Sequence, residues 1–137
     1  MKTEKYYMDR LLITIIILFS GLSRLIPHPP NFTPIIAMGI FGGAYFKDYR
    51  LAVLIPICAM LFSDLFIGFH VLMPWVYISL VLITIIGFLL KDKINIISSI
   101  LSVLIGSLIF FIISNLGVWL MGGYEKSIAG LTSCYIM

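Results

Sequence analysis

Residues 94–121 read INIISSILSVLIGSLIFFIISNLGVWLM, a stretch that contains no Asp, Glu, Lys or Arg. A helix needs about 20 predominantly apolar residues to cross the hydrocarbon core of a bilayer. We therefore predict one membrane-spanning helix from Ile94 to about Met121. Because the stretch is longer than a single span requires, this helix is expected to tilt or to break near residues 114–117.

The composition extends this conclusion to the whole chain. Of the 137 residues, 61% are hydrophobic and 11% are charged, whereas soluble domains are usually about 45–50% apolar. This small number of charged residues cannot cover a surface that faces water. The chain must therefore be solvated by the lipid bilayer. The net charge of +3 comes from basic residues in short, separate loops, which argues against a nucleic-acid partner. The predicted fold is all-α, a polytopic bundle of transmembrane helices.

Four further apolar runs are separated by charges and prolines, and we predict that they bring the number of spans to five: Leu11–Ile26, Ile35–Phe46, Leu51–Phe69 and Val71–Leu90. The run Ile35–Phe46 is short and is expected to be tilted or partly re-entrant. Residues 127–137 are apolar but too short to cross a bilayer. We expect them to begin a sixth helix, rather than to re-enter the membrane. Residues 1–137 would then be a single transmembrane domain, truncated at its C-terminus.

The distribution of basic residues predicts the orientation. With five alternating spans, the N-terminus and the loops near residues 47–50 and 91–93 share one face of the membrane. That face holds all the Lys and Arg residues except Arg24 and Lys126: Lys2, Lys5, Arg10, Lys47, Arg50, Lys91 and Lys93. Short loops rich in Lys and Arg stay in the cytoplasm. We therefore predict a multi-pass protein of the cell (inner) membrane with a cytoplasmic N-terminus.

Asp64 is the most informative polar residue, because it lies inside the apolar run LFSDLFI at residues 61–67. A carboxylate in a membrane helix is costly unless it is paired or hydrated, so we expect it to face the bundle interior or a wet cavity. Arg24, near the outer end of the first span, is its natural partner. Three interpretations stay open: a structural ion pair, a pair that contacts a ligand, or snorkelling of the side chains towards the lipid surface.

Asn31, Asn115 and Trp119 lie towards the same, extracytoplasmic end as Arg24 and Asp64. Asn115 lies in an apolar helix, where it forms either an interhelical hydrogen bond or a contact to a ligand. Trp119 lies one turn later and is either an interfacial anchor or a pocket wall that stacks on a flat ligand. These five residues are the candidate ligand site.

Gly39 and Gly43 form a GxxxG pair, which allows close helix packing in a membrane. We expect that contact within the monomer rather than with a partner. The only histidines, His28 and His70, match no metal-binding spacing, so we expect neither a metal nor a cofactor. No known catalytic motif is present, and an intramembrane enzyme built on His28, Asp64 and His70 lacks a recognised catalytic geometry. We therefore expect no enzymatic activity.

Four segments resemble a family of small bacterial multi-pass membrane proteins of unknown function: SRLIPHPPNFTP (23–34), FGGAYF (41–46), SDLFIGFH (63–70) and SNLGVW (114–119). The resemblance extends over nearly the whole chain and implies a membrane protein, but no activity. Members of this family continue into a further helix, which agrees with an incomplete C-terminus here.

The layout resembles, more distantly, the S components of energy-coupling-factor (ECF) transporters. Those helical proteins bind a micronutrient near the outer face and dock on a transmembrane coupling subunit driven by ATPases. S components usually carry spaced alanines for docking in the first helix, whereas residues 11–19 read LLITIIILF. The resemblance would place docking on the face of Gly39 and Gly43 instead.

Two hypotheses about function follow. The first is an S-component-like subunit of a micronutrient uptake transporter. In its outward-facing pocket Arg24 would meet an anionic group, Asp64 and Asn115 would form hydrogen bonds, and Trp119 would stack on the ligand. The second is a membrane scaffold or assembly partner without transport activity, whose polar residues only hold the helices together.

Overall fold

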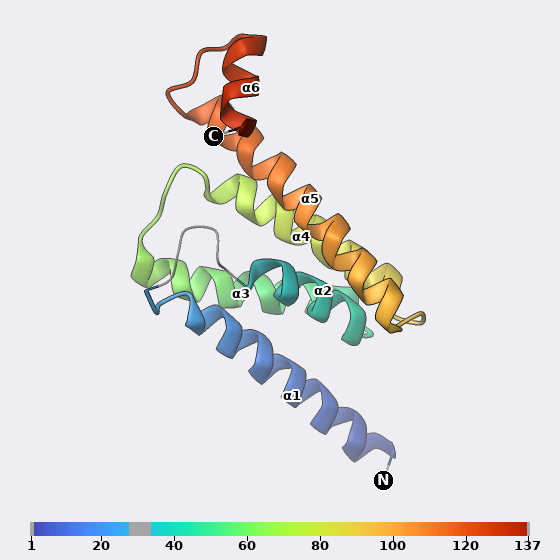
Figure 1. The fold of residues 1–137 in the computed structure, drawn as a ribbon. Coiled ribbons are helices and arrows are strands. Elements are labelled where there is room, and N and C mark those ends of the chain that lie inside the picture. Colours follow the sequence, from blue (N-terminus) through green and yellow to red (C-terminus); the bar gives the residue numbers. More distant parts are fainter. Residues whose placement is uncertain (1, 28–33, 137) are drawn as a thin grey trace.

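The computed structural model describes residues 2–27 and 34–136, and every regular element within these residues is a helix. Along the chain the described helices are α1 (Lys2–Ser23), α2 (Ile35–Tyr45), α3 (Tyr49–Ile67), α4 (Met73–Leu90), α5 (Ile96–Met121) and α6 (Ile128–Ile136). Figure 1 shows them as a splayed bundle in which α4 and α5 run side by side and α6 folds against the end of α5. The all-α prediction is confirmed.

Three of the described helices are long and apolar enough to cross a membrane: α3, α4 and α5. The predicted count of five spans therefore stays a prediction, and α2, with 11 residues, is shorter than a complete span requires. Helix α5 runs for 26 residues without a break, roughly 39 Å at 1.5 Å per residue. A hydrocarbon core about 30 Å thick accommodates such a helix when it tilts.

The helix ends follow from local residue chemistry. Asn95 and Ser98 form a capping box at the start of α5, in which each side chain accepts a hydrogen bond from the other residue's backbone N–H. Asp48 caps α3 by accepting from the N–H of Arg50 at 2.9 Å. At the other end of α3, Gly68 has a φ of 103° and a ψ of 150°. That conformation is almost restricted to glycine, so Gly68 ends the helix abruptly.

Helix α2 lies at the centre of the bundle and contacts α1, α3, α4 and α5. Its closest approach is to α4, where Gly43 faces the backbone of Thr84 and Phe88, and where Gly87 faces the backbone of Ile40. A Cβ atom on either glycine would overlap a backbone carbonyl oxygen of the other helix. Small residues at such a crossing let two membrane helices pack with their backbones almost in contact.

Gly39, one turn before Gly43, lies against Ile83 of α4, whose Cγ2 would be 2.8 Å from an added Cβ. The GxxxG pair therefore packs inside the chain, against α4. On the adjacent face of α2, Gly42 packs against Ala52 and Pro56 of α3. Pro56 lacks an N–H, and it lies in α3 where that helix meets α2.

The outer surface of the bundle is apolar. Large hydrophobic side chains that point outward include Phe19 of α1, Leu89 of α4 and Ile97 of α5, which are 73%, 74% and 67% exposed. Monomeric soluble proteins rarely expose contiguous apolar patches of this kind, so these faces indicate contact with lipid. The chain is thus a membrane-type helical protein.

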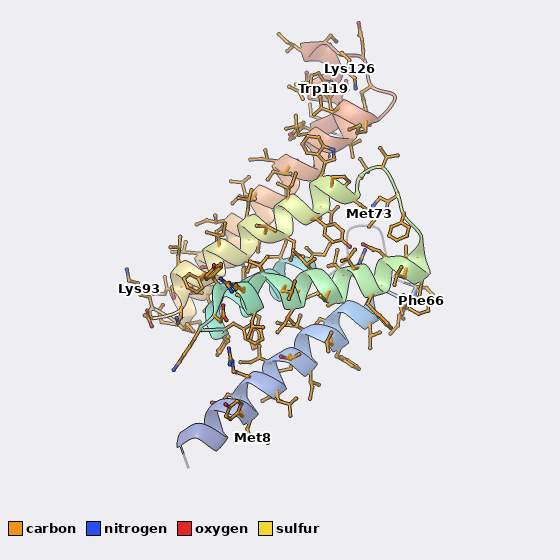
Figure 2. All side chains as sticks on the ribbon, turned by 180° about the vertical axis from the view of Figure 1, so that it is seen from behind. Met8, Phe66, Met73, Lys93, Trp119 and Lys126 are labelled. Atoms are coloured by element: carbon orange, nitrogen blue, oxygen red, sulfur yellow. The ribbon has the colours of Figure 1, made fainter. Side chains whose placement is uncertain are left out.

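The two ends of the bundle hold different connections between the helices. In Figure 2, Met8 and Lys93 lie towards one side of the molecule, and Phe66 and Met73 lie towards the other. Figure 1 shows the N-terminus, the α2–α3 turn and the α4–α5 turn at the end that holds Lys93. The α3–α4 connection lies at the opposite end, which is where the candidate site is found.

Candidate functional site

Arg24 and Asp64 form an ion pair between the segment that follows α1 and the last turns of α3. Arg24 lies in a turn, where its backbone N–H donates to the carbonyl oxygen of Gly21 at 3.2 Å. Its Nη1 lies 2.8 Å from Oδ1 of Asp64, and the two side chains are 9% and 1% exposed. The pairing expected from the sequence is present, and Asp64 faces the bundle interior.

The backbone and hydroxyl groups of α3 also contact the guanidinium of Arg24. Nη1 of Arg24 donates to Oγ of Ser63 at 2.5 Å and lies 3.4 Å from the carbonyl oxygen of Met60. The Ser63 hydroxyl in turn donates to that carbonyl at 2.8 Å. Within the described part of the chain, the buried Nε of Arg24 makes no hydrogen bond, and neither does Oδ1 of Asp64 apart from its ion-pair contact. The ion pair therefore has several partners in α3, but Nε of Arg24 can still donate a hydrogen bond and Oδ1 of Asp64 can still accept one.

Tyr77 adds a third helix to this cluster. Its hydroxyl donates to Oδ2 of Asp64 at 2.6 Å, so the carboxylate joins α4 to α3 and, through Arg24, to the end of α1. Sequence reasoning missed Tyr77. The available signal was its place near the start of the α4 run, at the same end of the bundle as Asp64, but a tyrosine there is also typical of the membrane interface.

Two cavities adjoin this cluster. The smaller has a volume of about 150 Å³ and is lined by Arg24, Ile35, Asp64, His70, Met73, Val76, Tyr77 and Phe110. The larger has a volume of about 520 Å³ and is lined by His70, Leu72, Val76, Phe110, Phe111, Ser114, Asn115, Val118, Cys134 and Tyr135. His70, Val76 and Phe110 belong to both linings, so the two cavities share a wall.

Asn115 lines the larger cavity, as a residue of a ligand site would. Its Nδ2 donates to the carbonyl oxygen of Phe111 in the preceding turn at 2.8 Å. The short helix α6 closes the same cavity from the side. Sγ of Cys134 lies 3.4 Å from the carbonyl oxygen of Asn115, and the hydroxyl of Tyr135 donates to that of Ile112 at 2.6 Å. Both α6 residues were missed by sequence reasoning, because nothing in residues 127–137 indicates which way the tail folds.

Trp119 is not among the residues that line either cavity. Its Nε1 donates to the carbonyl oxygen of Glu125 at 3.0 Å, and Nζ of Lys126 lies 5.4 Å from the centre of its ring. Lys126 also donates to the carbonyl oxygens of Trp119 and Leu120. Lysine commonly binds the last carbonyls of a helix. Trp119 therefore belongs to the α5–α6 turn, where Figure 2 shows it beside Lys126.

The other residues singled out from the sequence lie in different places. Asn31 and His28 lie outside the described residues. Gly39 and Gly43 lie in the α2–α4 contact, remote in the chain from the ion pair. His70 is exposed and lines both cavities. Among the residues that the structure describes, no three His, Cys, Asp or Glu side chains are grouped so that they could hold a metal ion.

Comparison with known proteins assigns a family but no activity. The model of a family of unknown function (DUF6580) matches residues 5–137, nearly the whole chain. No curated protein and no solved structure matches it. The resemblance to a family of unknown function is confirmed, while the more distant resemblance to S components stays a prediction.

Proposed function

The chain belongs to this family of unknown function, and from that premise we propose that it is a solute-binding membrane protein, an S-component-like subunit of a micronutrient uptake transporter. The observation that carries the proposal is the 520 Å³ cavity beside the buried Arg24–Asp64–Tyr77 cluster. Ligand cavities usually measure about 300–1,000 Å³ and combine apolar walls with a few convergent polar groups. The larger cavity has both the size and this kind of lining.

The proposed topology gives the cavities an outward opening. We propose five spans, α1 to α5, in one transmembrane domain with its N-terminus in the cytoplasm of a bacterial cell. The end that holds Lys91 and Lys93 would then be cytoplasmic. The cavities lie at the other end of the bundle, which supports capture of a solute from outside the cell (inner) membrane.

The proposed partners are a small-molecule ligand and a transmembrane coupling subunit with its ATPases. Docking on the face of Gly39 and Gly43 is disfavoured, because α4 covers both glycines within the chain. The apolar face of α1 that includes Phe19 is exposed among the described residues and offers a surface for such docking. No enzymatic role is proposed.

One observation favours the second hypothesis, a scaffold or assembly partner. Asp64 is 1% exposed and is contacted by groups from α4 and from the end of α1, an arrangement that also suits a purely structural clamp. A scaffold would keep this cluster and have no specific small-molecule ligand. The two functions therefore differ in whether the larger cavity binds anything.

A cavity-filling variant separates these functions. The protein in lipid nanodiscs is screened by thermal shift and calorimetry against a panel of vitamins and related micronutrients. Val76→Trp fills the wall that the two cavities share, and we expect it to weaken binding of any ligand at least ten-fold while Arg24, Asp64 and Tyr77 keep their contacts. Leu104→Trp, at an exposed position on α5 outside both linings, is the matched control.

Two results would count against a solute-binding role: no binding to the folded wild-type protein across the panel, or ligands whose affinity does not change in Val76→Trp. Asn115→Ala provides a milder second variant, because it alters only the rim of the larger cavity.

A further inference from the structure

The charges that line the two cavities cancel. Among the described lining residues, Arg24 and Asp64 are the only Arg, Lys, Asp or Glu side chains, and they are 2.8 Å apart. The larger cavity is lined by none of these residue types. Residues 28–33, which the structure does not describe, contain none of them in the sequence. Apart from the imidazole of His70, which lines both cavities, the side chains around a ligand in this site therefore carry no net charge.

An anionic ligand cannot readily displace the Asp64 carboxylate from Arg24. Its two carboxylate oxygens are engaged separately, Oδ1 by Arg24 and Oδ2 by Tyr77, and the side chain is 1% exposed. A ligand carboxylate close to Arg24 would also be close to Asp64, so attraction to one would be offset by repulsion from the other. Moving an anion out of water would then have no compensating gain.

The larger cavity offers mainly apolar contacts. The Nδ2 of Asn115 is already bonded to Phe111, and the Ser114 hydroxyl donates to the carbonyl oxygen of Phe110 at 2.6 Å. One N–H of Asn115 and the Ser114 hydroxyl proton are thus engaged by α5 itself, while the amide of Asn115 keeps a second N–H and an oxygen acceptor. Beside the polar groups of His70 and Asn115, most of the lining is the surface of aromatic and aliphatic side chains, above all Phe110, Phe111 and Tyr135.

We propose that the ligand is an uncharged amphiphile. This inference rests on the proposed solute-binding function and narrows its substrate class. The apolar, preferably aromatic, body of the ligand occupies the larger cavity. An uncharged hydrogen-bonding group, such as a carboxamide or a hydroxyl, lies in the smaller cavity beside Arg24, Tyr77 and His70. The earlier expectation that Arg24 meets an anionic group is replaced, because Asp64 already neutralises it.

Matched pairs of probes test the charge preference directly. Each pair differs only in a neutral group and a carboxylate: nicotinamide and nicotinate, pantothenol and pantothenate, biotinamide and biotin, indole-3-acetamide and indole-3-acetate. Binding to the wild-type protein in nanodiscs is measured by calorimetry at neutral pH, with empty nanodiscs as the blank. For every pair that binds, we expect the neutral member to bind at least ten-fold more tightly.

The Asp64→Asn variant provides the second arm. It keeps the side-chain shape and leaves Arg24 as an uncompensated cation, so the preference is expected to move towards the carboxylate member by ten-fold or more. Asp48→Asn removes a carboxylate from the opposite end of α3, where Asn can still cap the helix. That control is expected to leave the preference of the wild-type protein unchanged.

The outcomes distinguish this inference from the function on which it rests. Equal or tighter binding of the carboxylate members by the wild-type protein overturns the uncharged ligand and leaves solute binding intact. An unchanged preference in folded Asp64→Asn also overturns it. Binding of no pair at all overturns both proposals. If Asp64→Asn does not fold, the comparison of pairs on the wild-type protein still decides the question.

Discussion

Asp64 is buried because other groups replace the water that a carboxylate needs. A charged side chain in the middle of apolar helices is tolerated when it is paired and hydrogen-bonded. Here Arg24 supplies the opposite charge and Tyr77 supplies a hydroxyl. Removing one partner leaves the other charge buried alone, which costs more than losing the pair together.

Single replacements at the ion pair are therefore expected to be more harmful than the double replacement. Arg24→Ala or Asp64→Ala should each lower the free energy of unfolding by about 3–5 kcal/mol. Arg24→Ala combined with Asp64→Ala should cost less than either single replacement, because neither charge is then left without its partner. Denaturation of the purified variants in mixed detergent micelles measures all three. Additive losses would show that the two side chains are not energetically coupled.

Tyr77 contributes to the stability of the bundle through the hydrogen bond that its hydroxyl group donates to Asp64. Tyr77→Phe keeps the ring and removes the hydrogen bond to Asp64, so we expect a loss of about 1–2 kcal/mol of stability. Tyr45→Phe is the control, because Tyr45 is 46% exposed and its ring contact with Phe41 survives the change. The same detergent denaturation compares them, and an equal effect of both variants would contradict the role assigned to the Tyr77 hydroxyl.

At the level of elements, the fold depends on the crossing of α2 and α4. Helix α2 has too few residues to cross a bilayer by itself, and its glycines let it lie against the backbone of α4. Burial within the bundle, rather than contact with lipid alone, stabilises this short helix. Its sequence showed that close packing was possible, but not which helix would be the partner.

Adding one methyl group at this crossing should separate the two helices. Gly43→Ala places a Cβ on the backbone of Thr84 and Phe88, which cannot move as a flexible side chain can. We expect a loss of about 1–3 kcal/mol in stability. Gly123→Ala, where an added Cβ meets nothing within 4 Å, is the control and should be close to neutral. Thermal unfolding in nanodiscs tests the pair, and equal midpoints would contradict the close crossing.

At the level of the whole molecule, the bundle has an apolar exterior, one end that holds Lys91 and Lys93, and an opposite end that holds the ion pair and the two cavities beside it. The orientation of these ends decides which solution the cavities face. Cys58 and Cys134 are the only native cysteines, so replacing both by serine provides a background for labelling. Phe69, at the cavity end, is 69% exposed, and Lys93 marks the opposite end (Figure 2).

With a cytoplasmic N-terminus, a membrane-impermeant maleimide is expected to label Phe69→Cys on intact cells. Lys93→Cys should react only after the membrane is opened. Loss of labelling after pretreatment with an impermeant thiol blocker confirms that the reaction is external. The reverse pattern would place the cavities towards the cytoplasm and contradict the proposed uptake role.

The sequence predicted the positions of the helices more completely than it predicted the residues of the candidate site. The apolar runs predicted α2 to α5 to within about two residues, because charges, prolines and glycines interrupt hydrophobic stretches visibly. For Asp64 it named the correct partner, since a buried charge needs an opposite one and few were available. It grouped Trp119 with the site because one turn of α5 separates it from Asn115. In the structure Asn115 lines the larger cavity, whereas Trp119 contacts Glu125 and Lys126 of the α5–α6 turn.

The sequence by itself determined that this is an all-helical, lipid-solvated protein, because apolar length and the scarcity of charge depend only on the order of residues. It also determined that Asp64 requires a partner, since the cost of burying a carboxylate does not depend on the fold. Only the tertiary structure decided that Tyr77 completes the cluster, that α4 covers Gly43 and that α6 closes the larger cavity. These contacts join residues distant in the chain, and their geometry depends on how the helices cross, which no local pattern encodes.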